Sequence, residues 1–423
     1  MPLWLTLPAA VLLVVVLLKT AATLALATAY HRSQQRRVAG RDGGADLSVS
    51  VIVPAFNEAV TIEACLRGLA HQTYENLSAL VVDDGSDDGT SATVTEAITR
   101  IGGSTPIALV RKNNGGKASA LNLGLRMTSS DVVVCVDADS VLAPDAIERI
   151  VEPFEDRTVG AVGGAVKVAD SGTLLGRQQA MEYIAGLGLQ RAAFAHINAV
   201  QVLPGAISAF RRDALRSVGG YSSDTMVEDF DVTVAVQAAG FRAVVQPRAV
   251  AHTEGVASLR DLIKQRRRWT YGGFQVLGKY RRTLFTDDVG PLSRLGLPYF
   301  LIFPWVDVAI SAIFLTGFAT YAAMGLVGRF AVYLLATAAI AGALNLYAIR
   351  MTGESARLAG YGSLQPFFYA HVLTFATVVA GVTYALGRSV TWDKLERRGL
   401  TVGDDRPSLG AVATTVREAR PAA

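Results

Sequence analysis

Hydrophobic residues along the chain form two patterns, long unbroken runs near the two ends and short runs within a charged middle block. Four runs approach or exceed the length of about 20 apolar residues that crosses a hydrocarbon core of about 30 Å. They cover residues 3–30, interrupted only by Lys19, and residues 295–328, 330–349 and 366–387. The block between the first and second runs is long enough for a complete domain. We therefore expect a membrane protein with one large domain between its first two apolar runs.

The first run is either a retained membrane anchor or a cleaved signal peptide. An Ala-Thr-Ala sequence at residues 27–29 resembles a cleavage site, but no basic residue precedes the run, and the basic cluster comes after it: His31, Arg32, Arg36 and Arg37. A signal peptide has the opposite charge order. Because basic flanks stay on the cytoplasmic side, we expect an anchor over residues 1–30 and a cytoplasmic block over 31–285. The protein would then be a multi-pass protein of the plasma (inner) membrane.

The C-terminal region, residues 286–390, should contain about three spans, followed by a polar tail over 391–423 that we expect to be disordered. Three spans after a cytoplasmic block would place the tail outside, yet the basic residues that begin the tail favour the inside. One run therefore lies flat or re-enters. The run 295–328 is the predicted exception, because Pro298, Pro304 and Asp307 crowd its first half. The side of the membrane that holds the tail stays open.

The middle block alternates short apolar runs with helical periodicity. Apolar runs at 47–53, 79–82, 107–110 and 131–136 are typical of buried strands, and Ile62, Cys65, Leu66 and Leu69 recur at helical spacing. Further helices are expected around Val94 and over 117–126. Near-continuous apolar strands that alternate with helices indicate an α/β domain whose parallel sheet is covered on both faces.

Composition narrows the class of protein. Hydrophobic residues make up 51% of the chain and charged residues 18%, below the roughly 25% charged residues of soluble domains. The net charge of +4 is too small and too scattered for a nucleic-acid partner, whereas a lipid bilayer is an expected partner. Cys65 and Cys135 show no metal-binding spacing and fall within predicted core elements, so we expect buried thiols.

Acidic pairs follow two of the predicted strands. Asp83 and Asp84 end the second strand, and Asp137 and Asp139 end the fourth. Ligands bind beyond the carboxyl ends of strands in open α/β sheets, so both pairs should face one crevice. Hard cations such as Mg²⁺ or Mn²⁺ take one or two carboxylates together with substrate phosphates. Single acidic residues at such positions also cap helices, but two pairs at one edge favour a ligand site.

A third acidic pair, Glu228-Asp229, lies further along the chain. A positioned carboxylate can remove a proton from an attacking hydroxyl. The alternative is an acidic helix start stabilised by the helix dipole, and this alternative suits Asp231.

The segment 265–269, Gln-Arg-Arg-Arg-Trp, comes just before the second apolar run. A basic patch at the membrane surface, with side chains extended to lipid headgroups, accounts for Arg266 and Arg267. It does not account for Gln265, Arg268 and Trp269 as a set. Arginine grips phosphate through two hydrogen bonds, and tryptophan stacks on sugar rings.

Taken in order, these segments resemble the processive, membrane-integrated branch of the family-2 glycosyltransferases. The resemblance covers roughly residues 48–285 and rests on five segments: Val53-Pro54-Ala55-Phe56-Asn57-Glu58, Asp83-Asp84-Gly85, Asp137-Ala138-Asp139, Glu228-Asp229 and 265–269. Each segment alone is weak evidence for the family, whereas five segments in this order with apolar flanks are strong evidence. The chain has Val227 where the family usually has threonine before its Glu-Asp pair.

The resemblance implies a Rossmann-like GT-A fold, an interfacial helix near 259–280, and a metal-dependent, inverting transfer from a UDP-sugar to a growing β-linked polysaccharide. Asp139, with Asp137, would hold Mg²⁺ or Mn²⁺ at the diphosphate. Asp229 would be the base, with Glu228 beside it, and Gln265 and Trp269 would bind the acceptor. The remaining family positions would bind the nucleotide sugar: Ala55, Glu58, Asp83, Asp84, Lys117 and Arg268.

Several longer segments resemble the poly-β-1,6-N-acetylglucosamine synthases in particular, and the single N-terminal run also resembles the chitin-oligosaccharide synthases. They include residues 179–183, 203–206, 219–222 and 252–254. UDP-N-acetylglucosamine is the favoured donor, polymer export by the same chain is a related hypothesis, and a small accessory membrane subunit is a further possible partner. Single-sugar transfer to a lipid or polyprenyl phosphate is the alternative reaction. A catalytically dead scaffold and a transporter are the non-enzymatic alternatives, and the transporter is disfavoured because Lys19 and Asp307 are the only charges in the runs.

Overall fold

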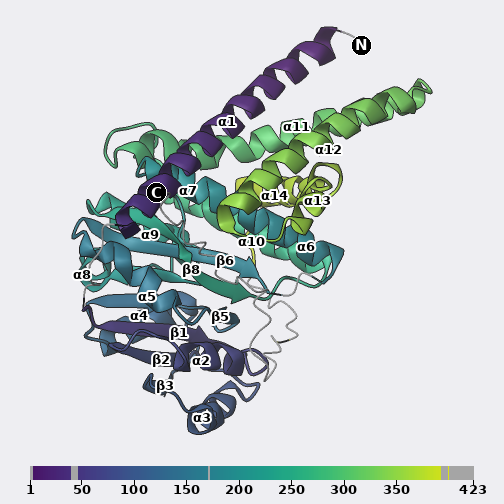
Figure 1. Ribbon diagram of the computed structural model, residues 1–423. Coiled ribbons are helices and arrows are strands. Elements are labelled where there is room, and N and C mark those ends of the chain that lie inside the picture. Colours follow the sequence, from purple (N-terminus) through teal and green to yellow (C-terminus); the bar gives the residue numbers. More distant parts are fainter. Residues whose placement is uncertain (1–2, 40–45, 170–171, 392–398, 400–423) are drawn as a thin grey trace, which may run out of the picture.

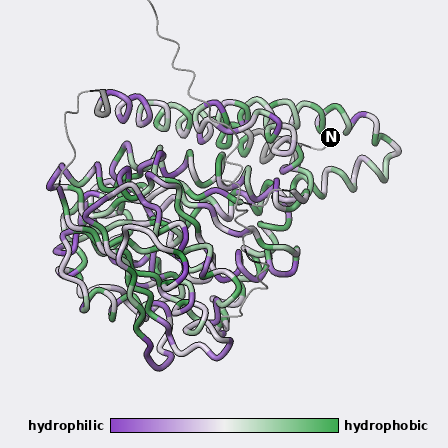
Figure 2. The backbone as a smooth tube through the Cα atoms, turned by 60° about the horizontal axis from the view of Figure 1, so that its bottom comes forward, coloured by the Kyte–Doolittle hydropathy of each residue, from purple (hydrophilic) through white to green (hydrophobic). Residues whose placement is uncertain are grey.

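The computed structural model describes residues 3–39, 46–169, 172–391 and 399. Its long apolar helices all lie on one side of an α/β domain, opposite the helix farthest from them, α3 (Figure 1). These helices are strongly hydrophobic along much of their length (Figure 2). The expected tail, 391–423, falls almost entirely outside the described residues.

One eight-stranded sheet forms the centre of the domain, in the order β3-β2-β1-β4-β7-β6-β8-β5. The first four of these strands are mutually parallel. From β4 onward the directions are mixed, because β7 is antiparallel to both β4 and β6, and β5 is antiparallel to β8, which itself runs parallel to β6. The strands are β1 (Val49–Ala55), β2 (Leu77–Asp83), β3 (Ile107–Arg111), β4 (Val132–Cys135), β5 (Ser140–Leu142), β6 (Val159–Val168), β7 (Ser208–Arg211) and β8 (Arg242–Thr253).

The parallel half confirms the predicted order of strands and helices. The predicted first strand covered residues 47–53, whereas β1 continues to Ala55 because its pairing with β2 extends to Asp83. The four strands of the mixed half were not predicted. The helices that cover the sheet are α2 (Ile62–Ala70), α3 (Thr90–Ile101), α4 (Lys117–Met127), α5 (Ala146–Val151), α6 (Leu174–Met181), α7 (Leu189–His196), α8 (Arg212–Ser217) and α9 (Glu228–Ala238).

Two apolar clusters cover the two faces of the sheet, as expected. One gathers α2, α3 and α5 and includes Cys65. The other gathers α4 and α7, the π-helix η2 (Glu182–Gly188) and the inner end of α1 (Leu3–Ala39), and it includes Cys135. Full burial of one leucine or isoleucine contributes about 1.5–3 kcal/mol, so these clusters hold the layers together. Both cysteines are buried free thiols, as predicted.

The inner end of α1 is fastened to the sheet by a buried tyrosine. Tyr30 is 3% exposed, and its hydroxyl donates to the Val245 carbonyl oxygen of β8 over 2.6 Å. The same hydroxyl accepts from the Val245 N–H at 3.1 Å. A helix long enough to cross a membrane is thus joined directly to the central sheet.

Three helical segments are long and apolar enough to cross a membrane: Val14–Arg36, Leu292–Ala323 and Val327–Thr352. The second combines η3 (Leu292–Gly296) with α11 (Leu297–Ala323), and the third is α12 (Val327–Thr352). A further pair, Arg357–Phe367 and Tyr369–Ala385, passes the same test only together, and it is bent by 50°. This pair contains α13 (Arg357–Gly362), η4 (Gln365–Phe367) and α14 (Tyr369–Ala385).

The bend lies in a different run from the one predicted to lie flat or re-enter. We expected run 295–328 to be the exception, but its helix α11 is continuous and contains Pro304 within it. Pro298 lies in the first turn of α11, directly after the π-helix η3. The bend falls instead at Phe368, within run 366–387.

The two charges within the apolar runs are paired rather than isolated. Lys19 of α1 lies 3.7 Å from the Asp307 carboxylate of α11, and its ammonium group also lies over the rings of Tyr299 and Phe303. The sequence argument against a transporter was that the spans of a transporter carry paired charges, and the structure pairs the two charges that these runs contain. An ion pair within the apolar runs therefore joins α1 to α11.

Candidate active site

The carboxylates that end β2 are fully engaged with the backbone and with neighbouring side chains. Asp84 is 2% exposed and accepts hydrogen bonds from the Gly115 and Gly116 N–H groups at 3.0 and 2.7 Å. It also pairs with Lys112. Asp84 therefore fixes the glycine turn that leads directly into α4.

Asp83, its neighbour, is held in the same manner. Its carboxylate accepts from the Ser86 N–H at 2.9 Å and from the Ser91 hydroxyl. Burial raises the pKa of Asp83, but these hydrogen bonds outweigh burial and leave the pKa below its ordinary value. Asp83 is therefore a stable carboxylate.

Lys117, the first residue of α4, joins two predicted carboxylate pairs. Its ammonium group lies 2.7 Å from Asp137 at the end of β4 and 2.8 Å from Glu228 at the start of α9. Desolvation opposes the charged form of Lys117, but the charges of Asp137, Glu228 and Asp229 hold its pKa well above the ordinary value. A continuous chain of contacts thus runs from Asp84 through the glycine turn and Lys117 to the other two pairs.

Asp229 has a different electrostatic environment from the other acidic residues. Enclosure by protein and the adjacent Glu228 carboxylate raise its pKa to about 6, while Lys117 and the Phe230 N–H oppose this rise. Such a carboxylate exchanges a proton near neutral pH, which is the property of a general base.

A loop from the mixed half of the sheet lies against the charged cluster. At Gly205, an added Cβ would lie 2.8 Å from the Lys117 ammonium and 3.3 Å from Asp137. Gly163 of β6 permits the approach of this loop, because a Cβ there would lie 2.8 Å from Leu203. The main chain at Gly205 therefore forms one wall of the cluster. The Leu-Pro-Gly sequence at 203–205 signals the turn but not its place beside Lys117.

The segment before Glu228 is fixed by α10 (Leu259–Lys279). An added Cβ at Gly272 would lie 2.7 Å from Val227, and Gln275 accepts a hydrogen bond from the Met226 N–H at 2.9 Å. Val227, the departure from the family pattern, fills this apolar contact with the glycine.

The first turn of α9 is also tied to the far end of α10. Asp231 accepts from the Lys279 ammonium at 2.7 Å and from the Tyr280 hydroxyl at 2.9 Å. Asp231 thus has a structural role, as expected, but through α10 rather than through the helix dipole alone. The helix that carries Gln265, Arg268 and Trp269 therefore holds both sides of the Glu228-Asp229 pair.

Arg266 contradicts its predicted role as a lipid-facing side chain. It is 6% exposed and forms a two-bond ion pair with Glu182 of η2. The Tyr369 hydroxyl donates to the same carboxylate at 2.5 Å. A buried guanidinium requires such a partner, and sequence patterns gave no signal for an acid 84 residues away.

The other residues predicted for the site lie at the end of β1, at the turn after β4 and on α10. Ala55 is buried at the end of β1, and Glu58 accepts from the Thr61 hydroxyl at 2.7 Å. Arg266 covers one face of Trp269, with its guanidinium 4.2 Å from the ring centroid. Asp139 is 9% exposed and accepts a hydrogen bond from the Ser140 hydroxyl. Gln265 and Arg268 are both partly exposed on α10.

The donor set at the end of β4 suits a hard divalent cation. Asp137 and Asp139 provide oxygen ligands on one short turn, and the Lys117 ammonium already lies at an Asp137 oxygen, where positive charge is favoured. The described residues contain no group of three or more His, Cys, Asp or Glu placed to hold a metal. Two carboxylates suffice where substrate phosphates complete the coordination.

Comparison with known proteins identifies the family. Residues 46–272 match the family described as glycosyltransferase like family 2. The chain belongs to this family. The family-2 domain thus spans the sheet, the charged cluster and the first two thirds of α10.

Curated relatives share part of the chain. The chain is 30% identical over 264 residues to a poly-beta-1,6-N-acetyl-D-glucosamine synthase of Staphylococcus aureus (strain COL). The match covers 62% of this chain and 63% of that relative. A synthase of the same name from Staphylococcus epidermidis is 29% identical over 240 residues, which cover 54% of this chain and 55% of the relative.

A solved structure extends the likeness to more of the fold. The mannosyltransferase of Pyrobaculum calidifontis, in complex with GDP-Man and Mn²⁺, is 27% identical with a TM-score of 0.60. The likeness covers 89% of this chain and all of that chain. The GT-A fold predicted for the family-2 domain is thereby confirmed.

Proposed function

We propose that the protein transfers a sugar, with N-acetylglucosamine favoured, from a UDP-sugar to a growing β-linked polysaccharide at the membrane. The reaction inverts the configuration at the anomeric carbon. The catalytic domain faces the cytoplasm of a plasma (inner) membrane, and the same chain contributes to export of the polymer. The names of the staphylococcal relatives support the choice of sugar and acceptor.

The observation that carries the proposal is the Lys117 bridge between Asp137 and Glu228. It brings residues from α4, β4 and α9 to one point, and the Asp84 turn aligns α4 there. A dead scaffold has no need to keep several carboxylates gathered around one ammonium group, because like charges held close together disfavour their own ionisation. The cluster therefore supports an enzyme over a scaffold.

In the proposed reaction, the Asp229 carboxylate accepts the proton of an acceptor hydroxyl as that oxygen forms a bond to the anomeric carbon. The bond from this carbon to the diphosphate oxygen breaks at the same time, and UDP leaves with the bonding electron pair. Lys117 holds Glu228 and Asp137 in place and offsets their charge. Asp83, Asp84, Glu58 and Ala55 provide the nucleotide side of the crevice.

Asp139 and Asp137 would hold a divalent cation, which would supply charge neutralisation for the diphosphate leaving group. The Mn²⁺ of the mannosyltransferase complex supports this assignment, with Mg²⁺ as the other cation expected. On α10, Arg268 is proposed to bind diphosphate, and Gln265 and Trp269 to bind the acceptor end. Because one face of Trp269 is covered by Arg266, an acceptor sugar would stack on the opposite face.

An assay of membrane fractions with a panel of nucleotide sugars tests the proposal. UDP-N-acetylglucosamine should give a long β-linked product, and chelator should abolish its formation until Mg²⁺ or Mn²⁺ is restored. GDP-mannose belongs in the panel because the solved relative binds it. A product of one sugar per lipid would replace polymerisation with single-sugar transfer to a lipid or polyprenyl phosphate.

Asp139→Ala provides the matched metal test. This variant should weaken cation-dependent binding of the nucleotide sugar, since it removes an oxygen ligand. Asp145→Ala is the control, because Asp145 pairs with Arg149 outside the cluster. An unchanged cation requirement in Asp139→Ala would remove Asp139 from the site.

A further inference from the structure

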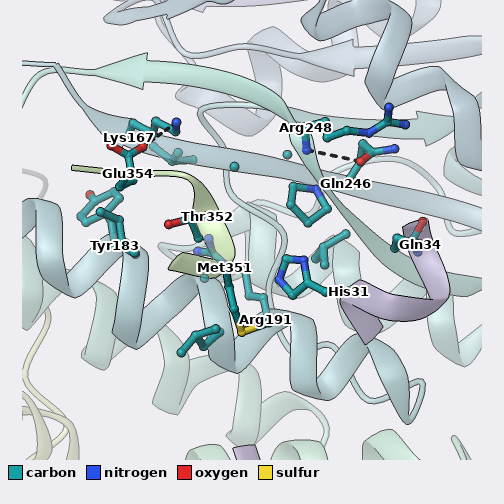
Figure 3. A pocket seen from close by; sticks show the side chains of 18 of the residues that line it. His31, Gln34, Lys167, Tyr183, Arg191, Gln246, Arg248, Met351, Thr352 and Glu354 are labelled. Carbon is teal, nitrogen blue, oxygen red and sulfur yellow. Dashed lines mark hydrogen bonds and ion pairs between the residues drawn. The ribbon is translucent and has the colours of Figure 1, made fainter. Parts of the chain in front are cut away.

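A cavity of about 370 Å³ is lined by none of the residues of the charged cluster, and its labelled side chains surround it in Figure 3. Its walls come from the inner end of α1, β6 and β8, η2 with α7, and the end of α12. A volume of this size is within the range of small-molecule sites.

Positive charge predominates in the lining. Lys167, Arg191 and Arg248 contribute three permanent cations, and Glu354 is the sole acidic residue among the described residues of the wall. Glu354 is already paired with Lys167 at 2.5 Å, and Arg248 pairs with Glu152, which lies outside the wall. Among the described residues, Arg191 is the one of these three cations that has no acidic ion-pair partner.

Arg191 has no hydrogen-bond or ion-pair partner among the residues that the structure describes, and its Nε is inaccessible to solvent. Burial disfavours the charged form and lowers the pKa of Arg191, although the charges of Tyr183 and Asp229 oppose this effect. A guanidinium carries five N–H donors and stays charged in proteins. A partly buried guanidinium whose Nε lacks an acceptor favours an anionic partner, which offsets the cost of desolvating that atom.

The location of the cavity indicates the kind of anion. His31 and Gln34 lie at the inner end of the segment Val14–Arg36, and Met351 and Thr352 end the segment Val327–Thr352. Both segments are long enough to cross a membrane, so the cavity opens where lipid headgroups would lie. Basic pockets between membrane helices on the cytoplasmic side bind lipid headgroup phosphates.

We propose that this cavity binds a phosphate ester, with Arg191 as its main contact and the headgroup of an anionic phospholipid as the favoured source. Arg248 and Gln246 of β8 form the opposite polar wall, and Val166, Ile184 and Leu189 provide apolar contacts for the ester's carbon chain.

The cavity shares one structural element with the charged cluster. Tyr183 of η2 lines the cavity, and the preceding residue, Glu182, forms the ion pair with Arg266 of α10. π-helices occur frequently at functional sites. An occupant of the cavity therefore acts on the position of α10 through η2.

The test measures thermal unfolding of the full chain, purified in neutral detergent and supplied with defined lipids. Phosphatidylglycerol should raise the unfolding temperature by about 5 °C or more at saturation, because a ligand of the folded state stabilises it. Phosphatidylcholine should have little effect. Glycerol 3-phosphate and inorganic phosphate form the soluble arms, and a similar rise with glycerol 3-phosphate would assign the site to a soluble phosphate ester.

Arg191→Met should abolish the rise caused by phosphatidylglycerol, while its unfolding temperature without lipid should be equal to or above that of the wild type. This combination distinguishes loss of a ligand from loss of the fold, because removal of an unpaired cation removes a desolvation cost. Arg191→Lys should keep part of the rise. Arg350→Met is the matched control, since Arg350 is exposed near the same end of α12.

An equal rise in Arg191→Met and wild type would overturn the proposal, as would the absence of a rise with every phosphate compound. Equal losses in Arg191→Met and Arg350→Met would also overturn it, because they indicate general attraction to a charged surface. None of these readouts depends on sugar transfer, so the proposed function and this site can fail separately.

Discussion

Two adjacent carboxylate pairs, Asp83-Asp84 and Glu228-Asp229, have the same chemistry in the sequence and different surroundings in the structure. Asp83 and Asp84 receive hydrogen bonds from main-chain N–H groups and serine hydroxyls. Glu228 and Asp229 instead lie side by side around a single ammonium group. The pKa of Asp83 is lowered and that of Asp229 is raised. Hydrogen bonds keep the structural carboxylate ionised, whereas burial, together with the like charge of Glu228, keeps the reactive one basic.

Asp229→Asn should have the largest effect on the reaction. Loss of the base should reduce kcat by about 10³-fold, within the range for general base catalysis, with binding of the nucleotide sugar largely retained. Because the folded-state pKa of Asp229 is raised, its ionisation disfavours the folded state as pH rises through about 6. The variant should therefore unfold at no lower temperature than wild type at pH 8. Release of UDP and thermal unfolding measure the two outcomes, and wild-type turnover would assign the base to another residue.

Asp84→Ala should affect structure rather than proton transfer. The change leaves the Gly115 and Gly116 N–H groups without their acceptor. Loss of these bonds should lower the free energy of unfolding by about 1–3 kcal/mol and weaken nucleotide-sugar binding through movement of Lys117. Denaturant unfolding and calorimetric binding provide the measurements. Asp87, which is exposed and close in sequence, provides the control. Asp87→Ala should change neither the free energy of unfolding nor nucleotide-sugar binding appreciably.

Two substitutions around Asp229 should move the pH profile in opposite directions. The acidic limb of kcat/KM should lie near pH 6 in the wild type, since the base must be ionised in the free enzyme. Lys117→Met removes a charge that lowers the pKa of Asp229, so the limb should move to higher pH. Glu228→Gln removes a charge that raises this pKa, so the limb should move to lower pH. Shifts of the same sign in both variants would contradict the assignment of the limb to Asp229.

Gln275→Leu should give the smallest effect. It removes the acceptor for the Met226 N–H and loosens the segment that enters the Glu228-Asp229 pair. One neutral hydrogen bond contributes about 0.5–1.5 kcal/mol, which corresponds to a loss in kcat of about 2- to 12-fold with KM for the donor unchanged. Gln275→Glu keeps an acceptor oxygen and should restore most of kcat. An equal loss in both variants would show that Gln275 acts in some other manner.

The parallel half of the sheet could be predicted from the sequence because its strands are continuous apolar runs that end at acidic residues or glycine turns. β4, for example, is buried along its whole length and leads to Asp137. The mixed half lacks this pattern. β6 contains Gly160, Gly163 and Gly164, and its pairing with β8 shifts register at Gly164. Glycine and register shifts weaken the alternation on which strand prediction depends.

The candidate site likewise has one part that local sequence predicts and one part that it does not. Strand ends predict that Asp83, Asp84, Asp137 and Asp139 lie at one edge of the sheet, because the rule needs only local sequence, and the parallel pairing of β2 and β4 with β1 agrees with it. The contacts of α10 depend on residues far away in the chain, and the Arg266–Glu182 pair joins positions 84 residues apart. No local pattern specifies such a pairing, so Arg266 was assigned wrongly to the lipid surface.

The Lys19–Asp307 contact has a consequence for biosynthesis. Lys19 emerges from the ribosome 288 residues before Asp307, so at about 5–20 residues per second it waits roughly 15 to 60 s for its counter-ion. During this interval the first apolar helix holds a charge whose partner has not yet been made. The family-2 domain is synthesised within the same interval, and Tyr30 can join the helix to the sheet before the ion pair exists. The pair therefore forms only after the family-2 domain has been synthesised, and before the last two apolar segments have been made.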